Sequence, residues 1–202
     1  TIGSIPIDVT KDNVDILCFS CHKSLFGVQG LGALYMKEGV APRPLRFGGT
    51  GSKSESIEHP EFLPDKYECG TPNTPGIASL LGGLTFIESE GMEQISARKQ
   101  ALRARVIRGL SNIEGVTIYG DYEASPALPV VSFNVADKLP SEVGYALNRQ
   151  QIYVRVGLTC SPVAHQTIGT FPAGAVRVSP GYFTTDDDVD RFLEEMTVIA
   201  GQ

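Results

Sequence analysis

The sequence predicts an α/β protein in which a piece of an α/β sheet precedes an α+β unit. Three features lead to this prediction: short apolar runs that read as strands, two long helical segments, and a second group of strands and helices after them. The chain has 202 residues, 42% of them hydrophobic, which is enough for one good core or two small ones. We expect a sheet region at 1–75, a linking helix at 76–90 and a small α+β domain at 91–202.

The first part of the chain contains two predicted strands, at about 14–20 and 32–37. The first is nearly continuous in apolar residues, which is typical of a strand buried on both faces of a parallel sheet. A glycine-punctuated turn, residues 23–30, joins the two strands. Residues 41–73 read as a loop rich in proline and glycine, and so long a loop inside a compact domain is usually functional or mobile.

Two helices are predicted in the middle of the chain. The first runs from about Pro75 to Glu90, with Thr74 as its cap and Pro75 in the first helical position. The second runs from Met92 to about Leu110. We interpret its basic side chains as a solvated helix face. They are Arg98, Lys99, Arg103, Arg105 and Arg108.

The last part of the chain alternates strands and helices. Strands are predicted at 116–119, 130–135, 152–156 and 175–179, and helices at 141–150 and 185–200. The last helix begins with a capping-box pattern at Thr185 and Asp188. The acidic residues Asp186 and Asp187 are favourable near the positive end of that helix.

Composition and charge narrow the class of protein. The formal net charge is −6 and the pI is near 5.1, so we expect no nucleic-acid partner and no anionic membrane partner. No apolar run reaches the roughly 18 residues that a membrane-spanning helix needs. The start has no secretory signal and no initiator Met, so we expect the chain to begin partway through a longer protein.

The four cysteines, Cys18, Cys21, Cys69 and Cys160, have spacings that suggest no disulfide framework. An intracellular, cytoplasmic protein with reduced thiols is the resulting expectation.

The first candidate site is the run Ser20-Cys21-His22-Lys23 at the carboxyl end of the first strand. Ligands of open α/β sheets bind outside the carboxyl ends of the strands. A lysine beside an apolar wall is desolvated, which lowers its pKa and frees a neutral amine to attack an aldehyde. Ser20 and His22 can donate to a phosphate in the same corner. The alternative is an exposed lysine just past a strand end.

The same residues fit a second pattern, because Cys18, Cys21 and His22 have the C-x-x-C-H spacing of covalent haem attachment. That pattern begins here inside an apolar strand, without an export signal. A structural zinc site is disfavoured too, because one C-x-x-C pair supplies half of the ligands and no second pair exists. We therefore predict no metal site.

Two glycine-containing loops are candidates for binding a phosphate. They are Gly48-Gly49-Thr50-Gly51 and Gly70-Thr71-Pro72-Asn73. Backbone N–H groups and threonine hydroxyls in such loops suit an anion. Ordinary loop chemistry explains them equally well.

The last candidate site combines Arg155, Cys160 and Arg177, with His165 between the last two. Two arginines around a lone cysteine favour its thiolate and can hold a carboxylate in a bidentate grip. The alternative is a buried structural cysteine. His165 is interpreted as a helix-capping or surface residue rather than a catalytic one.

These segments together resemble the class V aminotransferase group of fold-type I pyridoxal-phosphate enzymes, in its cysteine desulfurase and selenocysteine lyase branch. The resemblance runs from the first residue to the last, in order, which is far more specific than any single motif. It rests on residues 19–27, 29–35, 67–76, 155–160, 165–170 and 175–179. It implies a partial large domain that binds pyridoxal 5′-phosphate, followed by a complete α+β small domain.

The resemblance also implies a role for each candidate residue. Lys23 matches the lysine that binds the cofactor, and Ser20 and His22 match side chains that hold its phosphate. Gly49, Thr50 and Thr71 match cofactor contacts that cross to the neighbouring subunit of a homodimer. Arg177 matches the arginine that binds the substrate carboxylate, Arg155 a second pocket arginine, and Cys160 the cysteine that accepts sulfur from L-cysteine.

Two departures from the family pattern stand out. Cys21 occupies a position where the family usually has a smaller, non-thiol residue. Several cofactor contacts of the family would lie upstream of Thr1, which predicts a missing N-terminal part, or a companion polypeptide or oligomer, over 1–75.

The alternatives to a desulfurase are an aminotransferase, a selenocysteine lyase, or a non-catalytic fragment that contributes only an interface. Fold-level analogy does not separate these activities. Cys160 is the discriminating feature, because a plain aminotransferase does not need it.

Overall fold

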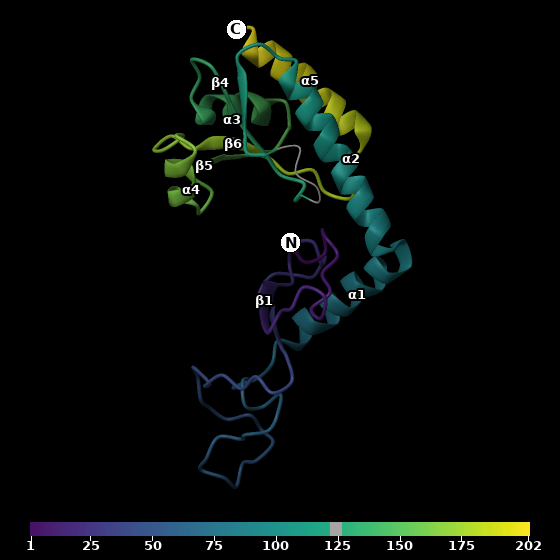
Figure 1. The fold of residues 1–202 in the computed structure, drawn as a ribbon, viewed down its shortest axis with the longest axis vertical. Helices are drawn as coiled ribbons and strands as arrows, with labels where there is room; N and C mark the ends of the chain where they lie inside the picture. The colour runs from purple at the N-terminus through teal and green to yellow at the C-terminus, as the bar shows by residue number, and fades with distance from the viewer. Residues whose placement is uncertain (122–126) are drawn as a thin grey trace. The chain divides into compact units, whose positions relative to one another are not determined.

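A computed structural model describes residues 1–121 and 127–202 (Figure 1). The chain forms two compact units, which we call unit 1 (Thr1–Gly91) and unit 2 (Met92–Gln202). Within the described residues, no helix combines the length and the apolar character needed to cross a bilayer.

Unit 1 contains a two-stranded sheet. Strands β1 (Ile16–Ser20) and β2 (Gly32–Met36) pair antiparallel, with Cys18 opposite Leu34. The sequence predicts both strands at these positions, which is confirmed, but it predicts a parallel sheet, which is wrong for this pair. The physical reason is the short turn at 21–31, because parallel strands need a crossover of about a dozen residues or more.

The sheet of unit 1 is less covered than its apolar sequence predicts. Ile16 and Leu34 are each 45% exposed, and Cys18 is exposed too. A two-stranded sheet also leaves the outer edges of both strands without a neighbour within the unit. Unit 1 therefore presents apolar sheet surface that its own described residues do not cover.

Helix α1 (Thr74–Glu90) confirms the predicted helix but has a different cap. Asn73, not Thr74, is the N-cap, because its Oδ1 accepts a hydrogen bond from the backbone N–H of Gly76 at 3.1 Å. Its Nδ2 also donates to the Gly30 carbonyl at 3.1 Å. One asparagine therefore caps the helix and ties it to the turn after β1, a tertiary contact that local propensity does not report.

Unit 2 is an α+β unit with a four-stranded antiparallel sheet of order β3-β4-β6-β5. Its elements are α2 (Met92–Ser111), β3 (Val116–Tyr119), β4 (Val131–Val135), α3 (Pro140–Arg149), β5 (Arg155–Gly157), α4 (Pro162–Thr167), β6 (Ala175–Val178) and α5 (Asp186–Ala200). The predicted elements are confirmed, although β5 begins later than predicted. Helix α4 was not predicted, because six residues are too few to show a helical period.

The core of unit 2 lies between one face of this sheet and the helices α2, α3 and α5. Val131, Phe133 and Val135 of β4 are buried against it, whereas Ser132 and Asn134 belong to the opposite face. This is the period-two alternation of a strand that covers a core with one face only. The opposite face of the sheet, which we call the outer face, carries the polar side chains of β4.

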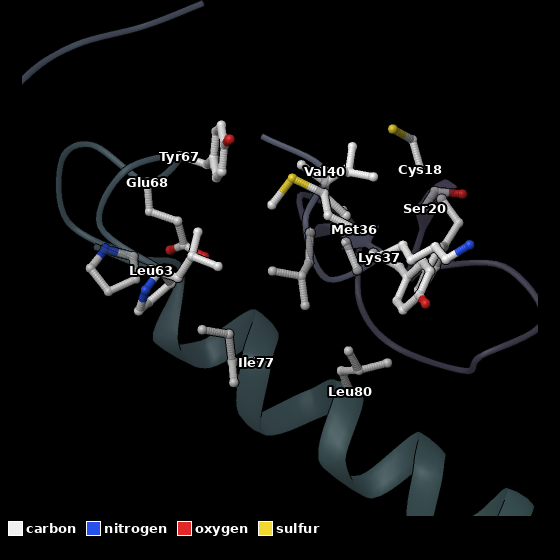
Figure 2. A pocket seen from close by; sticks show the side chains of 18 of the residues that line it. Cys18, Ser20, Met36, Lys37, Val40, Leu63, Tyr67, Glu68, Ile77 and Leu80 are labelled. Carbon is white, nitrogen blue, oxygen red and sulfur yellow. The ribbon is translucent and has the colours of Figure 1, made fainter. Parts of the chain in front are cut away.

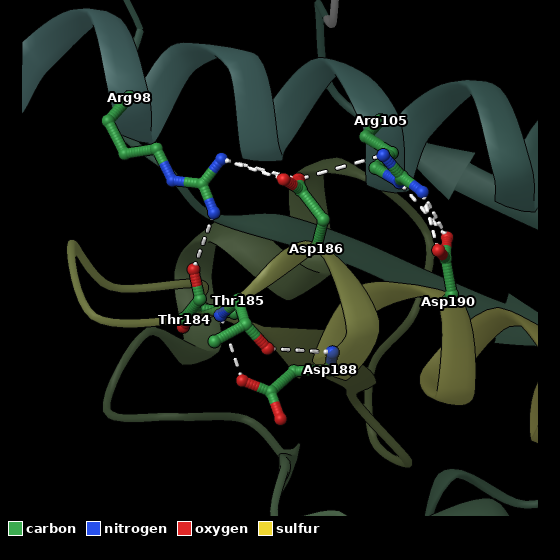
Figure 3. Close-up of polar contacts among 7 residues, drawn as sticks. All are labelled: Arg98, Arg105, Thr184, Thr185, Asp186, Asp188 and Asp190. Atoms are coloured by element: carbon green, nitrogen blue, oxygen red, sulfur yellow. Dashed lines mark hydrogen bonds and ion pairs between the residues drawn. The ribbon is translucent and has the colours of Figure 1, made fainter.

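Ion pairs join helix α2 to the first part of helix α5 (Figure 3). Arg98 Nη1 lies 3.2 Å from Asp186 Oδ1. Arg105 Nη2 reaches both carboxylate oxygens of Asp190, at 2.5 and 2.6 Å. The bidentate geometry fixes the two helices relative to each other, which a single exposed ion pair would not do.

The basic face of α2 is therefore only partly the solvated face that the sequence predicts, since Arg108 is exposed but two other basic residues are buried. Lys99 is only 3% exposed and Arg103 only 9%. Burial lowers the pKa of the Lys99 amine. Arg103 Nη2 donates to the Asp121 carbonyl at 3.3 Å. The periodic pattern was misleading because it does not report that Arg98, Arg103 and Arg105 have hydrogen-bond or ion-pair partners within unit 2.

The capping box of α5 is confirmed (Figure 3). The Thr185 hydroxyl accepts from the Asp188 N–H at 3.1 Å, and the Asp188 carboxylate accepts from the Thr185 N–H at 2.9 Å. The bond from the Thr185 backbone lowers the pKa of the Asp188 carboxyl group. Arg98 also donates to the Thr184 carbonyl at 2.9 Å, so α2 supports the segment that leads into α5.

A close backbone approach joins β5 to β6, and it predicts a large loss of stability for Gly174→Ala. A Cβ at Gly174 (φ +81°) would lie 2.2 Å from the carbonyl carbon of Gly157, whereas one at Gly169 (φ +75°) meets no described atom within 4 Å. Left-handed backbone alone costs an alanine about 1–2 kcal/mol. We expect Gly169→Ala to lose about that much and Gly174→Ala at least about 4 kcal/mol, because backbone must also shift.

The measurement is urea unfolding of the 202-residue chain and both variants, followed by far-ultraviolet circular dichroism. Equal losses in the two variants would contradict the close approach of β5 and β6.

Candidate functional site

In the turn after β1, the side chain of Cys21 is buried and the next two side chains, those of His22 and Lys23, are exposed. Cys21 is fully buried, and its backbone N–H donates to the Leu31 carbonyl at 3.1 Å while its carbonyl accepts from Gly27 at 3.0 Å. These bonds close the turn around Cys21. His22 and Lys23 are exposed, so the amine of Lys23 does not have the desolvation that the sequence predicts. Within the described chain, no hydrogen bond occupies the side chain of either residue.

The two glycine-containing loops predicted to bind phosphate lie together. The Gly70 N–H donates to the Gly49 carbonyl at 2.8 Å, which brings Thr50 and Thr71 to neighbouring loops. The second loop is also tied to the turn after β1 through Asn73, as described above. Among the described residues, no hydrogen bond joins Thr50 or Thr71 to the segment Ser20–Lys23 itself.

The hydroxyl of Thr50 belongs to a short chain of hydrogen bonds. Ser52 Oγ donates to Asp65 Oδ1 at 2.5 Å and lies 2.8 Å from Thr50 Oγ1. These bonds, led by that from Ser52, lower the pKa of the Asp65 carboxyl group. The loop that carries Thr50 is therefore held to residue 65 of the following segment, in addition to Gly70.

A groove of about 1280 Å³ runs over the open side of unit 1 (Figure 2). Its walls come from both strands, the segment at 63–73 and helix α1. The residues labelled around it are Cys18, Ser20, Met36, Lys37, Val40, Leu63, Tyr67, Glu68, Ile77 and Leu80. Ser20, the last residue of β1, is thus at the margin of a largely apolar groove.

In unit 2, Arg155 and Arg177 stand directly opposite each other in the pairing of β5 with β6. Both belong to the outer face, because their neighbour Val176 is buried in the core. Like charges directly opposite in an antiparallel pair are destabilising. The Nε of Arg177 is also buried and has no hydrogen-bond partner in the described chain. An anion here would relieve the repulsion and accept from Arg177.

Cys160 lies in the loop after β5 and is exposed. Thr159 and Cys160 both have positive φ, 44° and 64°. Left-handed backbone is uncommon outside glycine and is unfavourable for a β-branched residue such as Thr159. The Ser161 N–H donates to the Leu158 carbonyl at 2.9 Å and closes this tight loop. The cysteine is thus presented on a strained turn three residues after the strand that carries Arg155.

His165 is buried, 6% exposed, which corrects the prediction of a surface residue. Its Nδ1 lies 2.7 Å from Thr170 Oγ1, and its carbonyl accepts from the backbone of Thr170 and Phe171. The prediction failed because helix α4, which turns His165 inward, was not anticipated. Its contacts hold the segment between Cys160 and β6.

The four cysteine thiols differ in how far they are buried. Desolvation raises the pKa of the Cys21 thiol, which disfavours its thiolate. Cys69 is half-buried. Cys18 is exposed, so the burial inferred from its apolar strand is wrong, because β1 lacks a covering layer in unit 1.

The sequence did not point to Tyr119, Ser132 and Asn134, which share the outer face with the two arginines. Each alternates with buried apolar residues, so the period-two pattern places them on a polar face. Only the register of the strands adds that this face is the one with Arg155 and Arg177.

The family model of class V aminotransferases matches residues 1–192. The chain belongs to this family. It is 34% identical over 204 residues to a probable cysteine desulfurase of Mycolicibacterium paratuberculosis, which covers 99% of this chain and 29% of that protein. It is 32% identical to a probable cysteine desulfurase of Pyrococcus abyssi, covering 96% of this chain and 48% of that protein.

Among solved structures, the apo structure of a cysteine desulfurase from Thermococcus onnurineus matches with a TM-score of 0.86 at 28% identity. The match covers all of this chain and 50% of that one. The predicted fold class, the α/β fold type I of pyridoxal-phosphate-dependent transferases, is confirmed. The class V chain spans about half, or less, of the length of the relatives that it matches.

The exposure of the thiols predicts their order of alkylation in the 202-residue class V chain. We expect iodoacetamide to modify Cys160 and Cys18 first and Cys21 last, at least roughly tenfold more slowly, because thiolate character and access both control the rate. The raised pKa of Cys21 leaves it less thiolate than an ordinary thiol at any given pH.

Peptide mapping by mass spectrometry over time measures the three rates. In urea the difference should disappear. A native Cys21 that reacts as fast as Cys160 would show that the turn after β1 is not closed as described.

Proposed function

We propose that the chain is the C-terminal part of a pyridoxal-phosphate-dependent cysteine desulfurase, which transfers sulfur from L-cysteine to Cys160 and releases alanine. The observation that carries the proposal is the combination in unit 2 of an exposed cysteine on a strained loop with two opposed arginines that have no acidic partner among the described residues. The named relatives are desulfurases, which supports the same reading. An aminotransferase has no use for Cys160.

The residues of unit 1 are suited to the cofactor. The Ser20 hydroxyl and the exposed His22 are unoccupied within the described chain, as phosphate donors should be. Lys23 offers an exposed amine for the cofactor aldehyde. Pyridoxal phosphate, when bound, acts as an electron sink for the substrate carbon atoms. In this proposal Lys23 also moves the proton at the substrate Cα.

Gly49, Thr50 and Thr71 are proposed to reach the cofactor of a second copy in a homodimer. The bond between Gly70 and Gly49 supports a shared role for their loops, since it holds both in one place. Thr50 now contacts Ser52, so its hydroxyl would have to exchange that partner for phosphate.

Arg177 is proposed to bind the substrate carboxylate, and Arg155 to assist it. In this proposal the thiolate of Cys160 is the nucleophile of the transfer. This thiolate attacks the sulfur of L-cysteine, a sulfur–sulfur bond forms and the carbon–sulfur bond breaks. The electron pair of the broken bond stays with the substrate, whose β-carbon takes up a proton and becomes the methyl group of alanine. The cysteine persulfide keeps the transferred sulfur, so no external oxidant is needed.

The remaining parts of the proposed enzyme lie outside this chain. The exposed apolar groove of unit 1 supports a covering segment, either the missing N-terminal part or a companion polypeptide. All four thiols are free, which suits a reducing compartment such as the cytoplasm.

Lys23 is predicted to be the cofactor lysine. After a full-length protein with this chain is incubated with pyridoxal phosphate and borohydride, we expect the cofactor label on the Lys23 peptide, because its amine is exposed at the end of β1. Peptide mass spectrometry locates the label, and Lys23→Ala should abolish it. A label on Lys37 or Lys53, or on no lysine, would refute the assignment.

Cys160 is predicted to accept the sulfur. In the full-length protein, Cys160→Ala should lower alanine production from L-cysteine by about two orders of magnitude or more, because the nucleophile is lost. Cys18→Ala and Cys21→Ala serve as matched controls and should stay active. Loss of activity only in Cys21→Ala would overturn the assignment. Activity of Cys160→Ala on selenocysteine but not on cysteine would indicate a selenocysteine lyase.

A further inference from the structure

One cross-strand row on the outer face of unit 2 contains four hydrogen-bond donors. Tyr119 of β3 pairs with Ser132 of β4, Ser132 pairs with Arg177 of β6, and Arg177 pairs with Arg155 of β5. Neighbouring strands lie about 4.8 Å apart, and opposite Cβ atoms are separated by about 4.5–5.5 Å. Arg177 is therefore flanked by Arg155 on one side and by the Ser132 hydroxyl on the other.

The donors of this row have few internal acceptors. In the parts of the chain that the structure describes, no hydrogen bond occupies Ser132, Arg155 or Arg177. The row contains no carboxylate. Tyr119, Ser132 and Arg177 are half-buried and Arg155 is exposed. A row of two cations and two hydroxyls with this burial suits an acceptor, and a carboxylate, which has about four lone-pair sites, is a suitable one.

Asn134 sets the direction of the last donor. Its Nδ2 donates to the Gly174 carbonyl at 3.1 Å, which fixes the orientation of the amide, and lies 3.4 Å from the Tyr119 hydroxyl oxygen. Because Tyr119 accepts there, its own O–H remains available as a donor. Gly174 is also the residue that approaches Gly157, so the same contact joins Tyr119 to the start of β6.

We propose that Ser132 and Tyr119 are further binding residues for the substrate carboxylate, which extend the site of Arg177 and Arg155 along the row. This rests on the proposed function, in which Arg177 binds the carboxylate of an amino acid. The guanidinium of Arg177 takes two lone-pair positions of the carboxylate, and the Ser132 hydroxyl takes one of those left over. Tyr119 is the next donor along the row and closes its far end.

The test uses propionate, which has the carboxylate and carbon skeleton of alanine without its amine, and the 202-residue chain itself. Binding is followed in nuclear magnetic resonance spectra through the Nε–Hε signal of Arg155, which every variant retains, and also through that of Arg177 wherever this residue is present. Propionamide, which is neutral and of similar shape, should cause no shift. Ser132→Ala should raise the Kd for propionate roughly three- to tenfold, the effect of one lost hydrogen bond to a charged group in a half-exposed site. Tyr119→Phe should also raise the Kd for propionate.

Thr117→Ala is the matched control, since Thr117 is on the outer face of β3 but one pair outside the row. Its Kd should equal that of the unmodified chain. Binding that is lost in Arg177→Gln but unchanged in Ser132→Ala and Tyr119→Phe overturns this inference and leaves the carboxylate role of the arginines intact. No propionate-dependent shift in the unmodified chain overturns both. The dispersion of the same spectra shows that each variant is folded.

Discussion

The register of β5 against β6 is the constraint on which the functional argument depends. It sets Arg155 directly opposite Arg177. Two like charges in such a cross-strand pair are destabilising unless an anion binds between them. The close backbone approach of Gly157 and Gly174 keeps the two strands in this register. A shift of the register by one residue would turn one of the arginines toward the core. The positions of the two charges therefore depend on this strand pairing.

In unit 1, one buried side chain, that of Cys21, determines the shape of the turn after β1. Cys21 fills the inside of the turn after β1, and its backbone bonds close that turn. The two side chains that follow it, His22 and Lys23, are consequently exposed beyond the end of the strand. The presence of Cys21 is thus explained by packing, because burial raises the pKa of its thiol and disfavours the thiolate that a nucleophilic role would require.

Most elements could be predicted from the sequence, because long helices and apolar strands have strong periods. Local signals such as the Thr185–Asp188 box were also readable. The failures have tertiary causes: Lys99 and Arg103 are buried when unit 2 folds, α4 is too short to show a period, and the direction of β2 depends on a turn. Arg155, Arg177 and Cys160 could be proposed as site residues from the sequence, whereas proposing Ser132 and Tyr119 required the strand register.

The ion pairs between α2 and α5 connect the first and last elements of unit 2. Residues of α5, among them Phe192 and Met196, fill the core that α2 and the sheet begin. Contacts of such large sequence separation form slowly, because a long loop must close first. During synthesis, the core of unit 2 therefore cannot close over the sheet with its arginine row until α5 has left the ribosome. Until then its apolar face stays open to solvent and to chaperones.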